Sequence, residues 1–240
     1  MSSHRVLIGV CTYQESENID TLLRRLRESL PQADILVVDD DSPDATAAHV
    51  EKLQESDKRL FLHIRKSERG LGSAIVFAVK HAVAQNYHFF LNLDADLSHD
   101  PLELPRLLDE AIGDETCDVV IGSRYVSGGR IVGWPLRRRV MSKMVNRFAT
   151  GVLRLPVADC SGSMRCYRVD SLRTMGLERL RCTSYAVLEE VLVRMHRMGF
   201  RMKELPITFT ERELGDSKLT ISEAFRSVYF MLRLAFQRSG

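Results

Sequence analysis

The sequence predicts an α/β fold in which a mostly parallel sheet carries helices on both faces. Continuous apolar segments alternate along the chain with segments whose apolar residues recur at helical spacing. Strands without polar alternation are buried on both faces, as the strands of parallel sheets are. The 240 residues, 45% hydrophobic and 28% charged, have the composition of a globular protein and the length of one α/β domain, or of one domain with a C-terminal extension.

The first half of the chain supplies most of the predicted sheet. Its apolar segments predict strands at 5–10, 34–40, 59–64, 87–96 and 117–123, and its helical patterns lie at 16–30, 45–55, 69–86 and 101–112. For the first helix we expect Ser16 as the N-cap and Pro31 as the stop. The helix at 69–86 opens with a glycine turn, "RGLGSA", which lacks the spacing of a P-loop or a dinucleotide fingerprint.

The pattern changes after residue 124. The segment 124–135 is rich in glycine and is expected to be a mobile loop. The remaining segments predict a basic helix at 136–153, strands at 164–168 and 201–209, a helix at 184–198, a polar loop at 211–218 and an apolar final segment at 221–240. We divide the chain into a domain at 1–219 and a C-terminal amphipathic helix at 220–240.

Polar and acidic residues follow three of the predicted strands, in "CTYQE", "VVDDDSPD" and "LDADLSHD". Ligands of open α/β sheets bind outside the carboxyl ends of the strands, so these segments are expected to converge on one crevice. Asp94 and Asp96 would repel each other there unless a cation lay between them. Hard divalent cations prefer carboxylate oxygens, so the pair predicts a metal site.

The distribution of charge points to an anionic partner. The formal net charge is only +2, but no acid occurs between Asp118 and Asp159, a stretch that holds eight arginines and lysines. The five cysteines form no C-x-x-C pair, which fits a reducing cytosol, and no apolar run is long enough to span a bilayer. We expect no nucleic-acid partner.

Eight segments taken together resemble the dolichol- and polyprenol-phosphate mannose synthases, inverting family 2 glycosyltransferases of the GT-A fold. They are "CTYQESENI", "VVDDDSPDAT", "RGLGSA", "LDADLSHDP", "GSRYVSGG", "GWPLRRRVMSKMVN", "RCYR" and "ITFTERELGDSK". They occur in order from about residue 5 to residue 222. The resemblance implies transfer of a sugar, foremost mannose from GDP-mannose, to a polyprenyl (dolichyl or undecaprenyl) monophosphate. Cys11 and Leu188 depart from the family's usual proline and glutamine.

The resemblance also implies roles for individual residues. The donor nucleotide sugar would be held by Tyr13, Glu15, Asp40, Asp94, Ala95, Asp96 and Ser98, of which Asp94, Asp96 and Ser98 would bind Mg²⁺ or Mn²⁺. Arg124 would serve both donor and acceptor, and Arg138 and Ser142 would bind the acceptor phosphate. Arg212 and Lys218 would close over the diphosphate, and the catalytic set would be Asp96, Arg124, Arg212 and Lys218.

The chemistry explains this choice of residues. Negative charge develops on the departing diphosphate, where a metal ion and basic side chains stabilise it. A phosphate monoester is already largely ionised at neutral pH, so it requires no catalytic base. Glu189 and Glu190 are the remaining candidates for a base, but we expect one polar and one partly buried helix residue there. His99 is expected to be a solvent-facing loop residue.

A polyprenyl acceptor implies work at a bilayer. The segment 227–236, Trp134 and the cluster Arg137–Arg139 predict a cytoplasmic protein peripheral at the cytoplasmic face of a membrane. The final helix would lie on the bilayer, dock on a membrane-protein subunit, or pack against its own domain. Two alternatives stay open for function: a glucosyl or other hexosyl donor, or a non-catalytic nucleotide-sugar-binding subunit of a membrane complex.

Overall fold

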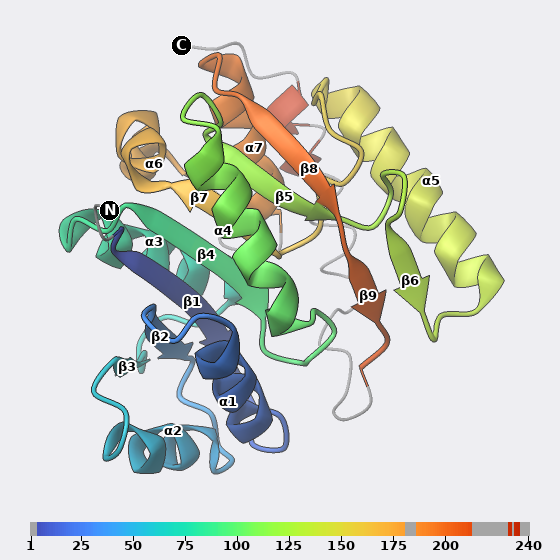
Figure 1. Cartoon of the computed structure of the whole chain (residues 1–240). Coiled ribbons are helices and arrows are strands. Elements are labelled where there is room, and N and C mark those ends of the chain that lie inside the picture. The colour runs from blue at the N-terminus through green and yellow to red at the C-terminus, as the bar shows by residue number, and fades with distance from the viewer. Residues whose placement is uncertain (1–3, 181–185, 213–229, 232, 236–240) are drawn as a thin grey trace.

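The computed structural model describes residues 4–180, 186–212, 230–231 and 233–235. Its centre is a seven-stranded sheet of order β3-β2-β1-β4-β7-β5-β8 (Figure 1). The strands are β1 (Val6–Thr12), β2 (Asp34–Asp39), β3 (Leu60–Ile64), β4 (Phe89–Asp94), β5 (Val119–Ser123), β7 (Arg165–Arg168) and β8 (Met202–Pro206). All pairs are parallel except those of β7, which runs antiparallel to β4 and β5. The predicted fold class, a mostly parallel α/β sheet, is confirmed.

Helices cover both faces of this sheet (Figure 1). One hydrophobic core lies beneath α1 (Ile19–Ser29), α2 (Thr46–Gln54) and α4 (Leu104–Gly113), the last preceded by the short η1 (Pro101–Glu103). The other core lies beneath α3 (Leu71–Ala84), α6 (Val169–Met175) and α7 (Val187–Arg197), and it also takes in the end of α5 (Leu136–Leu153). With both faces covered, the central strands are buried throughout, as the continuous apolar segments predicted.

Two local predictions about the helices need correction. The N-cap of α1 is Asn18 and not Ser16, whose backbone N–H donates instead to Asp44. The helix ends at Ser29, before Pro31, as expected. The sequence analysis also missed α6 and the short η2 (Leu177–Arg179), which follow β7 directly. Helix α3 does begin after the predicted glycine turn, where Gly70 has a φ of 120° that favours glycine.

The prediction of a loop throughout 124–135 is wrong, whereas the predicted mobility of this segment stays a prediction. This segment contains β6 (Arg130–Val132), which pairs in parallel with β9 (Thr208–Thr210) to form a second, two-stranded sheet. A single bridge between His99 and Phe209 ties this small sheet to the loop that follows β4. The glycine-rich segment is therefore held beside the carboxyl end of the main sheet.

Part of the C-terminal segment can be placed. Residues 230–231 and 233–235 are helical, and Leu234 is buried in the core beneath α7. Arg197 of α7 donates to the carbonyl oxygen of Leu234 over 2.7 Å. Four of these five residues, all except Arg233, pack on their own domain, whereas the rest of the predicted helix at 220–240 lies outside the described residues. The division into 1–219 and 220–240 stays a prediction.

Candidate active site

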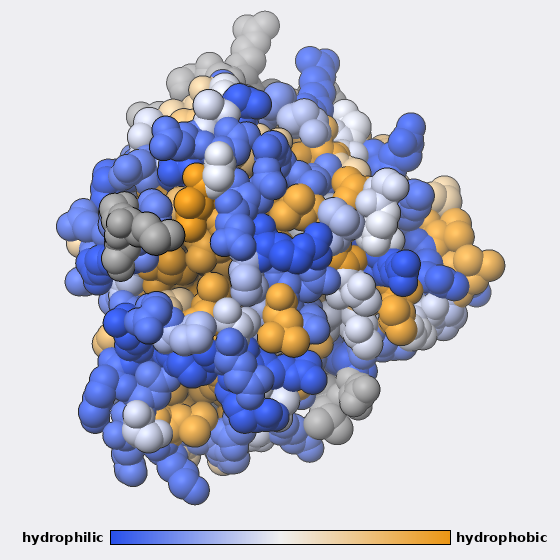
Figure 2. All heavy atoms as spheres, in the orientation of Figure 1, coloured by the Kyte–Doolittle hydropathy of each residue, from blue (hydrophilic) through white to orange (hydrophobic). Residues whose placement is uncertain are grey.

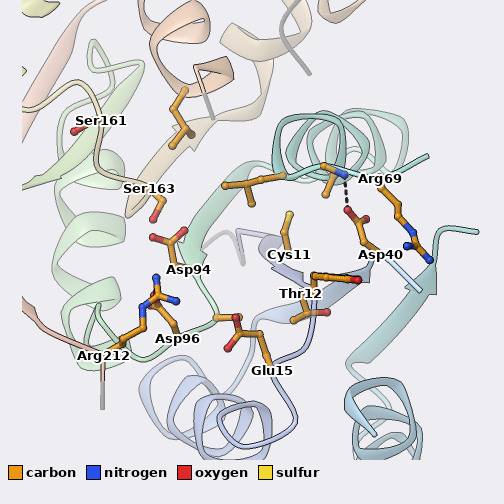
Figure 3. A pocket seen from close by; sticks show the side chains of 16 residues that line it. Cys11, Thr12, Glu15, Asp40, Arg69, Asp94, Asp96, Ser161, Ser163 and Arg212 are labelled. Carbon is orange, nitrogen blue, oxygen red and sulfur yellow. Dashed lines mark hydrogen bonds and ion pairs between the residues drawn. The ribbon is translucent and has the colours of Figure 1, made fainter. Parts of the chain in front are cut away.

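A pocket of about 390 Å³ lies at the carboxyl ends of β1, β2 and β4 (Figure 3). Register places Cys11 of β1 opposite Asp94 of β4, and Thr12 opposite Asp39 of β2, so the three strands end together. Because β7 is antiparallel, the segment that enters it reaches the same edge. The lining residues include Cys11, Thr12, Tyr13, Glu15, Asp40, Arg69, Gly70, Asp94, Ala95, Asp96, Ser161, Ser163, Leu188 and Arg212. The convergence predicted for the strand ends is confirmed.

Asp94 and Asp96 lie together on the pocket floor. Asp96 is almost fully buried, and its Oδ1 accepts hydrogen bonds from the backbone N–H (3.1 Å) and the hydroxyl (2.5 Å) of Ser98. Its Oδ2 lies 2.8 Å from Nη2 of Arg212. Burial raises the pKa of Asp94; His99 opposes this rise and Asp96 adds to it. Ser98 thus orients Asp96 from behind and is not itself part of the pocket lining.

The donor set fits a hard divalent cation that is partly ligated by a substrate. Asp94 and Asp96 bring two neighbouring carboxylates to the pocket, and no group of three His, Cys, Asp or Glu side chains that could hold a metal occurs among the described residues. Mg²⁺ in particular is commonly bound by one or two carboxylates and completes its shell with substrate phosphates and water. Asp94 and Asp96 would hold such an ion, which would supply a Lewis acid to a diphosphate.

The opposite wall of the pocket is preorganised by a buried ion pair. Asp40 is buried and its Oδ1 accepts from both Nε (2.7 Å) and Nη2 of Arg65, while its Oδ2 accepts from the Gly70 N–H over 2.7 Å. Arg65 also donates to Ser73 and to the Gly70 carbonyl. Asp40 therefore lines the pocket and at the same time fixes the glycine turn before α3.

Tyr13 and Glu15 lie in the same wall. The guanidinium of Arg69 is 5.8 Å from the centre of the Tyr13 ring, so an aromatic face and a cation stand at the rim together. Glu15 is buried and accepts from the side chain of Asn18 over 2.9 Å. Burial raises the pKa of the Cys11 thiol at the pocket floor, which keeps this group neutral.

Arg124 lies outside the pocket lining. It forms a two-pronged ion pair with the fully buried Asp159, with Nε–Oδ2 at 2.7 Å and Nη2–Oδ1 at 2.8 Å, and it also donates to Ser161. The guanidinium holds the pKa of Asp159 below its usual range against the effect of burial. This pair fixes the loop that carries Ser161 and Ser163 to the pocket edge, so the geometry gives Arg124 a positioning contact.

The predicted acceptor residues lie beyond this pocket, on and beside α5. Arg138 stacks over Trp134 at 4.0 Å and makes a 2.5 Å ion pair with Glu211. The hydroxyl of Ser142 lies 2.8 Å from that of Tyr125. The structure therefore brings Arg138 and Ser142 to one helix and places Arg212 at the metal motif, whereas Lys218 lies outside the described residues.

Two expectations about titratable residues, one for His99 and one for the pair Glu189 and Glu190, are wrong. His99 is buried and not solvent-facing: it packs edge-on against Phe209, and its Nδ1 is 3.7 Å from Asp94. Burial lowers its pKa. Glu189 and Glu190 are both buried; Glu190 pairs with Arg194, and burial raises the pKa of Glu189 to about 7.

Sequence reasoning missed Arg65, Arg69, Asp159, Ser161 and Glu211 as parts of the site. Asp159 carried a readable signal, because it ends the long acid-free stretch. Arg65 and Arg69 precede the glycine turn, but their roles depend on contacts with Asp40 and Tyr13, which are distant in sequence.

The α/β fold and the pocket are those of a glycosyltransferase of the GT-A type. Acidic residues at the end of β4 line a pocket that is suited to bind a cation and a diphosphate. Residues 7–176 match the family described as "Glycosyl transferase family 2", and the chain belongs to that family.

Similar proteins agree with this assignment. The chain is 39% identical to an undecaprenyl-phosphate mannosyltransferase of Micrococcus luteus, over 90% of this chain and 88% of that protein. It is 38% identical to a polyprenol monophosphomannose synthase of Mycolicibacterium smegmatis, over 95% of this chain and 85% of that protein. The family resemblance drawn from the sequence motifs is confirmed.

Two solved structures share the fold at low identity. A glucosyl-3-phosphoglycerate synthase of Mycobacterium tuberculosis, in complex with Mn²⁺, UDP-glucose and phosphoglyceric acid, has a TM-score of 0.71 at 14% identity, covering 100% of this chain and 82% of that one. A mannosyltransferase of Pyrobaculum calidifontis, in complex with GDP-mannose and Mn²⁺, has a TM-score of 0.60 at 19% identity, covering 90% of this chain and 59% of that one.

Proposed function

We propose that this protein transfers mannose from GDP-mannose to a polyprenyl monophosphate with inversion, using Mg²⁺ or Mn²⁺. The observation that carries the proposal is the acid pair at the pocket floor beside Arg212, opposite a wall suited to a nucleoside. The two curated relatives, similar over nine-tenths of this chain or more, are named for mannosyl transfer to or synthesis on polyprenyl phosphates.

The residues of this chain divide the work. Tyr13, Glu15 and Arg69 receive the nucleoside, and Asp40 holds the wall in place. Arg212, now on Asp96, is near enough to neutralise the diphosphate as its bond to the sugar breaks. The acceptor phosphate arrives already ionised, so it requires orientation by Arg138 and Ser142 and no proton transfer.

The acceptor side carries a surface suited to a bilayer. Six apolar side chains of α5 are between 49% and 68% exposed: Leu136, Val140, Met141, Met144, Val145 and Phe148. Figure 2 shows apolar side chains gathered at the right of the view, where α5 lies in Figure 1. Arg137, Arg138, Arg139, Lys143 and Arg147 share this helix, which has no acid.

Exposed apolar area with only positive charge is the composition of an interfacial helix on anionic lipid. Among the described residues, no helix combines the length and the apolar character needed to cross a membrane. From the exposed apolar and basic side chains of α5 we propose contact with a membrane surface through this helix, at the cytoplasmic face where a nucleotide sugar is supplied. The sequence left three contacts open for the final helix, and its Leu234 is buried in the helix's own domain.

A panel of nucleotide sugars offered with a short-chain polyprenyl phosphate tests the proposal. GDP-mannose with Mg²⁺ or Mn²⁺ should give the lipid-linked mannose, and chelation of the metal should abolish it. Preferential turnover of UDP-glucose would replace mannose with glucose. Nucleotide-sugar binding without any lipid product would support the non-catalytic alternative.

A further inference from the structure

Two consecutive residues of opposite charge, Glu211 and Arg212, follow β9 and contact two different sites. Glu211 Oε1 is 2.5 Å from Nη1 of Arg138, on the proposed acceptor side. Arg212 Nη2 is 2.8 Å from Oδ2 of Asp96, in the metal motif. Figure 3 shows the Arg212 side chain directed to Asp96 beside the pocket. Two adjacent residues therefore contact both the proposed acceptor-phosphate site and the proposed metal site.

The position of Glu211 is built into the backbone around it. Its N–H donates to the Val132 carbonyl over 2.9 Å, which extends the pairing of β6 and β9 by one residue. Gly133, with a φ of 88°, packs against it, and a Cβ at residue 133 would lie 2.7 Å from Cβ of Glu211. One residue earlier, the Thr210 N–H donates to the Ser98 carbonyl over 2.9 Å, which ties the same chain segment to the metal motif.

Each of these two side chains carries the same sign of charge as a group that we propose to bind at its position. The carboxylate of Glu211 places one negatively charged oxygen on the guanidinium of Arg138, as an oxygen of a phosphate would. A guanidinium on Asp96 supplies the positive charge that a divalent cation would supply between the two acids. Glu211 thus lies where the acceptor phosphate would bind Arg138, and Arg212 lies where the metal would bind Asp96.

We propose that Glu211 and Arg212 are internal stand-ins for the acceptor phosphate and the metal, and that displacing one promotes displacement of the other. The inference rests on the proposed function, because it takes Arg138 as the acceptor-phosphate residue. The two residues share a peptide bond, so movement of Arg212 from Asp96 to the diphosphate shifts the backbone that holds Glu211 on Arg138. Linkage then requires the reverse: the acceptor phosphate, by removing Glu211, makes Asp96 more available to metal.

Metal binding without any nucleotide gives a direct test. The full-length protein is titrated with Mn²⁺ and the free ion is measured by electron paramagnetic resonance. Arg212→Gln should bind Mn²⁺ more tightly than the wild type, although it should bind Mn²⁺ with GDP more weakly. A short-chain polyprenyl phosphate should tighten Mn²⁺ binding about two- to fivefold in the wild type, the range of an exposed ion pair.

Glu211→Gln supplies the decisive comparison. It should lower the KM for the polyprenyl phosphate by about two- to fivefold and should lose the effect of that phosphate on Mn²⁺ binding. A direct contact between phosphate and Mn²⁺ would persist in this variant, and that result would overturn the proposal. Asp170→Asn, which removes one carboxylate from the exposed pair with Arg173, is the matched control and should change neither quantity.

The test separates this inference from the proposed function. If Arg138→Ala raises the acceptor KM while Glu211→Gln leaves it unchanged, the acceptor site stands and the stand-in role is wrong. If Arg138→Ala also leaves it unchanged, the proposed acceptor site itself is wrong. An Mn²⁺ affinity that is weaker or unchanged in Arg212→Gln without nucleotide contradicts the role of Arg212 as a stand-in.

Discussion

The donor and acceptor sides of this molecule are built in opposite ways. On the donor side, buried networks fix each polar group before a substrate arrives, as Arg65 and the Gly70 N–H fix Asp40. On the proposed acceptor side, Arg138 lies on a largely exposed helix and its ion-pair partner Glu211 is half-buried. In the proposed function, the nucleotide binds a pocket whose Asp40 is already held by buried contacts, whereas the lipid phosphate binds an arginine on a largely exposed helix.

The largest effect is expected on the donor side, from Asp96→Asn. In the proposed function this substitution removes a metal ligand, and a metal acting as Lewis acid contributes several kcal/mol, so transfer should fall by about a thousandfold or more. The midpoint of thermal unfolding should change little, because the substitution relieves repulsion with Asp94 as it loses the pair with Arg212. Transfer near the wild-type rate at saturating Mn²⁺ would make the metal assignment wrong.

The buried side chain of Glu189 should make the stability of the protein depend on pH. Burial raises the pKa of Glu189 to about 7, with Arg165 opposing the rise. Between the unfolded pKa near 4.5 and the folded value, the folded protein binds more protons, so stability falls as pH rises across that window. Glu189→Gln lacks this loss and should be more stable than the wild type at pH 8 by about 3 kcal/mol.

Thermal unfolding from pH 4 to pH 8 checks this expectation. The advantage of Glu189→Gln should shrink toward pH 4, where Glu189 is protonated in both states. An advantage independent of pH would show that Glu189 does not titrate in this window. Glu178→Gln, on the short η2, provides a comparison in which the charge change is the same.

On the acceptor side, Arg138→Ala should raise the KM for the lipid phosphate about tenfold or more and leave that for GDP-mannose nearly unchanged. A hydrogen bond to a charged group contributes about 1.5–3 kcal/mol. Steady-state kinetics with each substrate varied in turn make the measurement, and Arg139→Ala on the same helix serves as the control. A rise in the KM for GDP-mannose instead would contradict the assignment of Arg138 to the acceptor side.

The smallest effect concerns the membrane-facing surface of α5. Met144 is 66% exposed, and burying its side chain in a bilayer contributes about 1.5 kcal/mol, so Met144→Ser should weaken binding to anionic vesicles about tenfold. High salt should release the protein as well, because the basic side chains lose their attraction to the lipid. Leu102→Ser, an exposed leucine on η1, should bind vesicles like the wild type, as measured by cosedimentation. Equal loss in both variants would argue against α5 as the contact.

The sequence predicted the donor side better than the acceptor side for a physical reason. Continuous apolar strands have a local signature, and parallel strands end at a common edge, so Asp94 and Asp96 could be assigned to a crevice from pattern alone. Three-residue strands that pair across a long separation have no such signature, so β6 was missed and β9 was predicted only as the end of a single strand at 201–209. The burial of His99 depends on Phe209, a neighbour found only in the folded chain.

The roles of individual arginines show the same limit. Family resemblance selected Arg124, Arg138 and Arg212, but spacing gives no information about which carboxylate each will meet. In the structure these are Asp159, Glu211 and Asp96, each far away in sequence. The proposed functions of Arg124 and Arg138 therefore stay predictions. So does that of Lys218, which lies outside the described residues.

The small sheet of β6 and β9 has a consequence for how the chain folds. Its strands are about 80 residues apart, so closing that loop is entropically costly until the main sheet has brought β5 and β8 together. The backbone hydrogen bonds at 130–132 and 208–210 should then form last during refolding. In native-state hydrogen exchange their amides should open with a lower free energy than those of β1 and β4, whose strands lie at the centre of the main sheet. Glu211 and Arg212, which we propose to leave their partners when metal and acceptor phosphate bind, directly follow β9. They would thus belong to a part of the chain that can rearrange without unfolding the rest.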